Sequence, residues 1–310
     1  MSARSLLRLI LLLQAGAAAF IAWLCVRGGL ALPLALGVGA LAVLVVRLAL
    51  TANNFVLSAR HASVTPAPFR LGLGARLRLF GEEFAATMLH TSWFMARARA
   101  GQRLYPGSAA APVLLLHGYG CNSGYWTQLT ARLDAARISH ATLDLEPLFA
   151  SIDDYVPLVA QAVAQLCAAS GAAHVHIVAH SMGGLVARAY LRAHGLARVG
   201  RVITLGTPHH GTSLASFGLG ANAAQMRRHG ARARPESAWL AALADGETAD
   251  LRARLTSIYT HHDNIVSPQS SSELAGARNL AFGGVGHVAL GRNARILDCV
   301  IAELENCARK

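Results

Sequence analysis

Charged residues are scarce in this chain, and lysine is nearly absent. Only 14% of the 310 residues are Asp, Glu, Lys or Arg, whereas 54% are hydrophobic. This composition excludes a disordered chain, and the length allows one large domain with an additional segment. The net charge is +12, but Lys310 is the only lysine and the arginines are scattered along the chain. With no basic cluster and only 6% aromatic residues, we expect no nucleic-acid partner.

The cysteines are few and lie far apart in the sequence. None of them forms a CxxC pair or another metal-ligand spacing, and their number is odd (Cys25, Cys121, Cys167, Cys299 and Cys307). Such a set does not build a disulfide framework. We therefore expect free thiols, which are typical of a reducing compartment.

Long apolar runs are concentrated at the N-terminus. Residues 9–26 read LILLLQAGAAAFIAWLCV and residues 30–46 read LALPLALGVGALAVLVV. Each run is close to the roughly 20 residues that a helix needs to cross a bilayer. Only the sequence RGG separates them, which predicts a tight turn and a hairpin of two transmembrane helices. A cleaved signal peptide is the alternative, but the second apolar run directly after the first favours the hairpin.

The arginines around these runs predict how the hairpin is oriented. Arg4 and Arg8 precede the first run and Arg47 follows the second, whereas the turn holds only Arg27. Positive flanks favour the cytoplasmic side, so we expect a two-pass protein of the inner or plasma membrane with its main domain in the cytoplasm. Because large domains can override this rule, a periplasmic or secreted location stays open.

The composition changes along the chain and predicts three segments. Residues 1–50 form the hairpin, residues 51–111 form an amphipathic connecting segment, and residues 112–310 form the main domain. In the main domain, short apolar runs such as PVLLLHG and HVHIVAH alternate with longer amphipathic patterns. This alternation predicts an α/β fold with a mostly parallel, doubly wound sheet and helices on both faces.

A serine flanked by small residues follows one of the predicted strands. Residues 179–183 read AHSMG, which matches the G-x-S-x-G turn of serine nucleophiles except that Ala179 replaces the first glycine. Such a turn exposes the hydroxyl and leaves no room for larger neighbours, so we interpret Ser181 as a nucleophile. Met182 begins the next helix, and its backbone N–H is a candidate oxyanion donor. Taken alone, the motif also fits a serine that caps a helix.

An upstream strand supplies the second candidate oxyanion donor. The run PVLLLHG leads into a loop that contains glycine, which is where this donor lies relative to the serine turn. We assign the donor to the backbone N–H of Tyr119. We expect His117 to orient the loop through hydrogen bonds.

A serine nucleophile needs a base, and the base needs an acid that orients it. Asp263 follows one predicted strand and His287 follows another, in the order serine, acid, histidine. We predict that these two side chains meet Ser181. Asp144 is the alternative acid, although it precedes the serine in the chain. Four further histidines are interpreted as loop or core hydrogen-bonding residues (His209, His210, His261 and His262).

Five motifs together resemble the α/β-hydrolase superfamily and, within it, bacterial lipases and related esterases. They are HGYG (117–120), AHSMGG (179–184), LGTPHHGT (205–212), HHDNIVSPQSS (261–271) and GHVAL (286–290). The resemblance implies the α/β-hydrolase fold, a triad of Ser181, His287 and Asp263, an oxyanion hole of two backbone amides, and ester substrates. It implies no metal and no other cofactor. The N-terminal hairpin lies outside the resemblance.

We therefore expect a membrane-anchored serine hydrolase whose partners are the lipid bilayer and a hydrophobic carboxylic ester. Residues 209–240 form a long insertion that predicts a cap over the acyl site, with an ordinary connecting loop as the alternative. Tyr125 and Trp126 are candidate substrate contacts, although aromatic residues at this position also fit core packing. An acyltransferase or a thioesterase would use the same triad, and a non-catalytic scaffold or a transport component is a further alternative.

Overall fold

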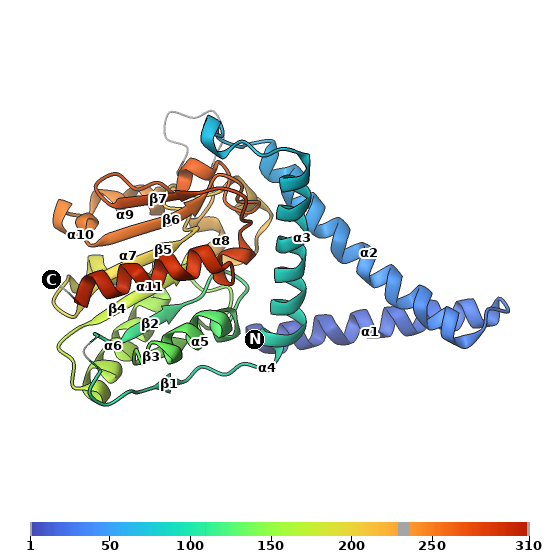
Figure 1. Cartoon of the computed structure of the whole chain (residues 1–310), viewed down its shortest axis with the longest axis horizontal. Helices are drawn as coiled ribbons and strands as arrows, with labels where there is room; N and C mark the ends of the chain where they lie inside the picture. The colour runs from blue at the N-terminus through green and yellow to red at the C-terminus, as the bar shows by residue number, and fades with distance from the viewer. Residues whose placement is uncertain (1, 109, 229–235, 309–310) are drawn as a thin grey trace.

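The computed structural model describes residues 2–108, 110–228 and 236–308. It contains a domain with a central sheet and a hairpin of two long helices that projects from it (Figure 1). The strands are β1 Gln102–Arg103, β2 Val113–Leu116, β3 His140–Leu143, β4 Val175–His180, β5 Val199–Leu205, β6 Leu255–Thr260 and β7 Arg278–Phe282. The helices are α1 Ala3–Arg27, α2 Leu32–Ala59, α3 Leu73–Leu89, α4 Met95–Arg97, α5 Thr127–Ala135, α6 Val156–Ser170, α7 Met182–His194, α8 Gly220–Gln225, α9 Ala238–Asp245, α10 Ala249–Ala253 and α11 Ala294–Ala308.

The sheet has the strand order β1-β3-β2-β4-β5-β6-β7. All neighbouring pairs from β3 to β7 are parallel, and only the edge strand β1 is antiparallel. Parallel strands need long crossovers, and helices supply them here. The predicted α/β fold with a mostly parallel sheet is confirmed.

The central strands are buried on both faces, so their side chains alternate between two cores. On one face, Leu114 and Ile177 pack with residues of α6 and α7. On the other face, Leu115 and Val178 pack with residues of α5 and α11. The near-continuous apolar runs in the sequence follow from this double burial. Because the strands from β3 to β7 are parallel, their carboxyl ends lie at one edge of the sheet, where the candidate site is found.

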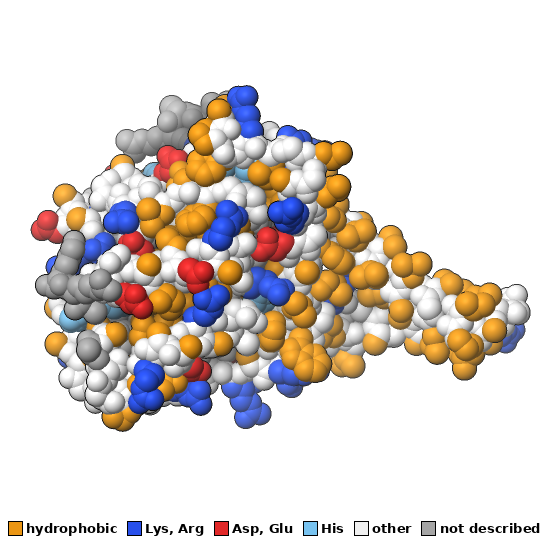
Figure 2. All heavy atoms as spheres, viewed as in Figure 1, with side chains coloured by type: hydrophobic (Ala, Val, Ile, Leu, Met, Phe, Trp, Pro, Cys, Tyr) orange, Lys and Arg blue, Asp and Glu red, His pale blue; other side chains and the backbone are white. Residues whose placement is uncertain are grey.

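The hairpin helices α1 and α2 expose most of their apolar surface. Each is long and apolar enough to cross a membrane, and only 6% and 17% of the residues in their most hydrophobic windows are buried. Figure 2 shows hydrophobic side chains along the whole projecting hairpin. The core helix of a soluble protein can be equally long and apolar, but it would be mostly buried. The exposure of α1 and α2 therefore argues against their being core helices.

Small residues allow α1 and α2 to pack closely against each other. Ala22, Ala35 and Gly39 are buried at their contact. A Cβ atom at Gly39 would lie 2.2 Å from the carbonyl oxygen of Ala18, which is too close for any side chain. Small residues at a helix contact are typical of membrane-embedded helix pairs.

The predicted boundary at residue 50 differs from the structure. The helix α2 continues to Ala59, and its last two turns reach the main domain. Residues 51–111 also contain the helix α3 and the edge strand β1. The hairpin and the connecting segment therefore form part of the wall of the main domain, as the position of α3 in Figure 1 illustrates.

Candidate active site

Ser181 occupies the sharp turn between β4 and α7. Its φ of 54° lies in the left-handed region, which a residue with a side chain rarely adopts. The turn is fixed because the Ser181 carbonyl oxygen accepts hydrogen bonds from the Gly184 N–H at 3.0 Å and the Thr207 hydroxyl at 2.9 Å. Close packing explains the small neighbours: a Cβ at Gly183 would lie 2.5 Å from the carbonyl oxygen of Leu116. The side chain of Ser181 faces a cavity, the serine cavity.

Asp263 and His287 lie on the loops after β6 and β7, and the structure brings them together. Nδ1 of His287 lies 2.8 Å from Oδ2 of Asp263, and the two side chains are 6% and 2% exposed. The other carboxylate oxygen, Oδ1, accepts the N–H groups of Ile265 at 2.8 Å and Val266 at 2.7 Å. One oxygen of Asp263 therefore holds its own loop while the other faces the imidazole. The catalytic roles of Ser181, His287 and Asp263 stay predictions.

The charges around His287 favour its protonated form. Burial alone would lower the pKa of the imidazole, but the Asp263 charge, the hydrogen bond to Asp263 and the Glu83 charge together raise it above its usual value. A protonated imidazole cannot accept a proton from a serine, so His287 loses the ability to act as a base as the pH falls through this raised pKa.

We expect kcat/KM for ester hydrolysis to fall on the acid side with a midpoint above the usual histidine pKa of about 6.5. The measurement is a pH profile of kcat/KM with a neutral ester, because this quantity reports ionisations of the free enzyme. An acid limb centred near the pKa of a carboxylic acid would contradict His287 as the base.

The two candidate oxyanion donors flank the serine. Met182 is the first residue of α7, where backbone N–H groups have no partner within the helix. The loop that carries Tyr119 runs against the serine turn, since a Cβ at the preceding Gly118 would lie 2.9 Å from Cβ of Ser181. His117 orients this loop: its Nδ1 lies 2.9 Å from the Gly118 carbonyl oxygen, and its Nε2 accepts the Leu145 N–H at 2.9 Å.

The alternative acid and bases take part in other contacts. Asp144 accepts the Ser123 N–H at 2.7 Å and lies 3.6 Å from Arg4, whereas the imidazole of His287 contacts Asp263. His209 is buried beside the guanidinium of Arg188. The other three histidines contact Glu236, the ring of Phe69 and the Gly284 N–H, respectively (His210, His261 and His262).

Tyr125 and Trp126 are not at the cavity, although the sequence suggested them as substrate contacts. Their exposed fractions are 1% and 0%, and both belong to the core between the sheet and α5. The ring of Tyr125 stacks on the ring of His180, with 4.1 Å between the centroids. The helical turn that follows the loop directs these side chains under the sheet edge, where burial of aromatic surface is more favourable than exposure.

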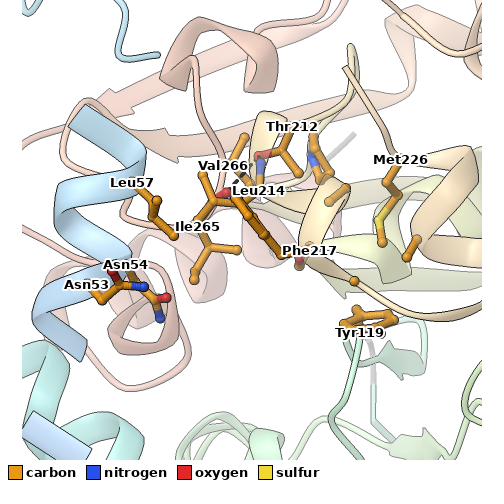
Figure 3. Close-up of a pocket in the computed structure, with 15 residues that line it drawn as sticks. Asn53, Asn54, Leu57, Tyr119, Thr212, Leu214, Phe217, Met226, Ile265 and Val266 are labelled. Carbon is orange, nitrogen blue, oxygen red and sulfur yellow. Dashed lines mark hydrogen bonds between the residues drawn. The ribbon is translucent and has the colours of Figure 1, made fainter. Parts of the chain in front are cut away.

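The serine cavity has a volume of about 590 Å³ and a mostly apolar lining. Leu214, Phe217 and Met226 line it from the predicted cap, residues 209–240, of which 229–235 lie outside the described residues. Figure 3 shows Asn53, Asn54 and Leu57 of α2 facing the cavity from the opposite side, beyond Ile265 and Val266. These α2 residues were not predicted, because the hairpin was expected to end at residue 50.

The last turns of α2 also contact the loop that carries Asp263. The Ser58 hydroxyl, which is buried, donates to the Asp263 carbonyl oxygen at 2.9 Å. In return, the Ser267 hydroxyl donates to the Ser58 carbonyl oxygen at 2.7 Å. The position of Asp263 therefore depends on α2, and not only on β6.

Glu83 of α3 is a further residue near the site that the sequence did not predict. Its carboxylate is 1% exposed and accepts the N–H groups of Val288 at 3.0 Å and Ala289 at 2.9 Å, directly after His287. Burial raises the pKa of Glu83, and these two hydrogen bonds oppose that effect. Its spacing in the sequence could have identified Glu83 as buried, because Leu79 and Ala86 mark the buried face of the helix and Glu83 falls on the same face.

Replacing Glu83 with glutamine is expected to lower kcat by roughly tenfold with little change in KM, because an amide N–H would face a backbone N–H beside His287. The acid limb of the pH profile should also move to lower pH, since one of the charges that raises the His287 pKa is removed. The matched control is Glu82→Gln, whose carboxylate instead accepts from the Asn293 side chain at 2.7 Å. Equal effects of the two substitutions would contradict a positioning role for Glu83.

The mostly parallel sheet with a serine turn at its edge is typical of an α/β hydrolase, and the comparisons with known proteins agree with this class. Residues 113–296 match the profile of the alpha/beta hydrolase family. The match covers more than half of the chain, and the chain belongs to the alpha/beta hydrolase family.

Two triacylglycerol lipases share a short segment with this chain. They come from Pseudarthrobacter phenanthrenivorans and Burkholderia plantarii, and each is 46% identical over 55 residues. This segment is 18% of the present chain and 17% and 15% of the two lipases. The chain therefore matches less than a fifth of the length of these curated relatives.

Solved structures of lipases share the fold. The mature form of a Bacillus licheniformis lipase has a TM-score of 0.57 and 19% identity, and the alignment covers 66% of this chain and 97% of that chain. Lipase B of Aspergillus fumigatus has a TM-score of 0.55 and 20% identity, with 65% of this chain and 53% of that chain covered. At these identities the similarity establishes the fold alone.

Proposed function

We propose that the protein is a membrane-anchored serine hydrolase that cleaves lipophilic carboxylic esters. The observation that carries the proposal is the arrangement at the sheet edge. A strained serine turn after β4 opens onto an apolar cavity, and a buried His287–Asp263 pair with a 2.8 Å contact lies on the loops after β6 and β7 of the same sheet. Family membership and the names of the similar lipases support the same reaction class.

The proposed reaction proceeds through an acyl-enzyme. His287 accepts the Ser181 proton as the hydroxyl oxygen attacks the ester carbonyl, and Asp263 stabilises the resulting imidazolium. The N–H groups of Tyr119 and Met182 stabilise the oxyanion, each contributing about 3 kcal/mol to lowering the barrier. The alcohol leaves with a proton from His287, and water then releases the acid by the same steps. Transfer to another acceptor would use the same intermediate, and product analysis separates the two reactions.

The proposed location follows from the hairpin. Its exposed apolar surface fits a bilayer, and the arginines around it favour a cytoplasmic main domain. Phe217 and Leu219 are 72% and 68% exposed beside the serine cavity, which fits contact with a lipid surface. A tether of this kind holds the cavity near the phase in which lipophilic esters are concentrated.

The test is labelling of the purified full-length protein with a fluorophosphonate probe, followed by hydrolysis of a p-nitrophenyl ester series of increasing chain length. We expect the label on the peptide that contains Ser181, and faster turnover of medium or long acyl chains than of acetate. Heat-denatured protein is the control for non-specific labelling. A folded protein that takes no label and hydrolyses no ester would leave the non-catalytic scaffold as the better explanation.

A further inference from the structure

A second cavity, the hairpin cavity, lies between α1, α2 and α3. Its volume is about 210 Å³, and its wall is mostly apolar, with Leu11 from α1, Leu50 from α2, and Phe84 and Met88 from α3. Thr87 of α3 also lines it. Helices from three separate segments of the chain therefore enclose it, and two of them are the helices of the hairpin.

The hairpin cavity adjoins the serine cavity. Asn54 of α2 lines both, whereas Leu50 lines the first and Leu57 the second. These residues follow one another along successive turns of the same helix. A chain that runs along this side of α2 would pass from the hairpin cavity, beside the Asn54 amide, into the space that Ser181 faces.

The position of the hairpin cavity along α2 matches the boundary between a bilayer and the main domain. From the start of α2 at Leu32 to Leu50 the helix rises roughly 27 Å, at about 1.5 Å per residue. The hydrocarbon core of a bilayer is about 30 Å thick. If the turn of the hairpin reaches the far interface, the cavity lies where the near leaflet meets the main domain, and lipid chains surround its helices.

Polar contacts hold the three helices around this cavity. Arg47 of α2 donates to the Gln14 side chain of α1 at 2.8 and 2.5 Å, and to the Ser92 hydroxyl at 2.6 Å, just beyond α3. A buried or lipid-facing guanidinium is costly unless it is hydrogen-bonded, so these contacts favour one fixed arrangement of the helices. The cavity is thus a defined space between helices that do not part freely.

We propose that the hairpin cavity admits the acyl chain of a long-chain ester directly from the bilayer, and that the chain passes Asn54 to bring the ester carbonyl to Ser181. The preferred substrate class is therefore a bilayer-resident long-chain ester. The proposal rests on the proposed hydrolase function and on the membrane location of the hairpin. It differs from a simple tether because the hairpin itself forms part of the substrate path.

The test fills the hairpin cavity from two opposite walls. Thr87→Trp on α3 and Leu50→Trp on α2 each introduce an indole into the cavity, and Ala85→Trp on the exposed side of α3 is the matched control. Each variant is reconstituted into phosphatidylcholine vesicles that carry a fluorogenic long-chain acyl ester. The same preparations are assayed with water-soluble p-nitrophenyl acetate, which can enter the serine cavity beside the exposed Phe217.

We expect both filled variants to lose at least about tenfold of the rate on the bilayer ester, because the indole occupies the space that the acyl chain needs. Their rate on the soluble ester should stay within about twofold of wild type, which also demonstrates that Ser181 is assembled and the protein folded. The Ala85→Trp control should retain both activities.

Two results would overturn the proposal. The first is wild-type turnover of the bilayer ester by either filled variant that remains active on the soluble ester. The second is a parallel loss of both activities in both filled variants, which would mean that the cavity serves only packing. A wild-type protein that hydrolyses neither ester and takes no fluorophosphonate label would instead overturn the hydrolase function, so the two failures are distinguishable.

Discussion

Replacing Ser181 with alanine is expected to lower kcat for ester hydrolysis by on the order of 10⁶-fold, since the residues of a catalytic triad act as a unit. The alanine variant keeps the strained turn, whose hydrogen bonds come from the Ser181 backbone and not from its hydroxyl. We therefore expect an unchanged thermal unfolding midpoint together with a complete loss of fluorophosphonate labelling.

The control for this variant is Ser216→Ala. Ser216 is exposed in the short helix Ser213–Phe217, whose neighbouring residues line the same cavity, so it tests for a general effect of losing a hydroxyl there. It should label and turn over at the wild-type rate. If Ser181→Ala retained activity within about tenfold of wild type, Ser181 would not be the nucleophile.

Replacing Asp263 with asparagine is expected to lower kcat by about 10⁴-fold. The side-chain carbonyl of asparagine can still accept the N–H groups of Ile265 and Val266, as Oδ1 does now. The amide N–H₂ then faces Nδ1 of His287, which must become an acceptor and leave its proton on Nε2. An imidazole in this tautomer cannot take a proton from Ser181, so the geometry survives while the base is lost.

The pH profile separates this explanation from simple loop damage. Asparagine removes the charge and the hydrogen bond that raise the His287 pKa, so that pKa falls. Because the active form is the neutral imidazole, the acid limb of the residual activity should move to lower pH. The matched control is Asp144→Asn, which alters the carboxylate bonded to the Ser123 N–H and should stay within about tenfold of wild type. Equal losses in the two variants would contradict the assignment of Asp263 as the orienting acid.

Several parts of the site were predictable because their signals are local. The serine turn is recognisable in AHSMGG because its backbone leaves room only for small neighbours, as Gly183 illustrates. The strand runs are recognisable because both faces of the sheet are covered, so the runs are apolar throughout. Asp263 and His287 were found from chain order and strand-end position, and the structure brings their side chains to 2.8 Å.

Other parts depend on contacts between distant segments. Tyr125 and Trp126 are an example, since nothing in their immediate sequence distinguishes a cavity wall from the core below it. Asn53 and Asn54 are poor helix formers, yet α2 continues through them to Ala59, and its last turns bond to the Asp263 loop. Glu83 contacts the loop of His287 by accepting the N–H of Val288, which lies 205 positions later in the chain.

By itself, the sequence determined the α/β fold, the hairpin, and the identity and order of the candidate nucleophile, acid and base, because periodicity and turn chemistry act over a few residues. Only the tertiary structure decided how α2 and α3 contribute to the site. Ser58 is hydrogen-bonded to the Asp263 loop, Glu83 accepts N–H groups of the His287 loop, and Asn54 lines two cavities. Such contacts arise when separate elements pack together, and packing is set by the combined shape of all of them, which no short stretch of sequence carries.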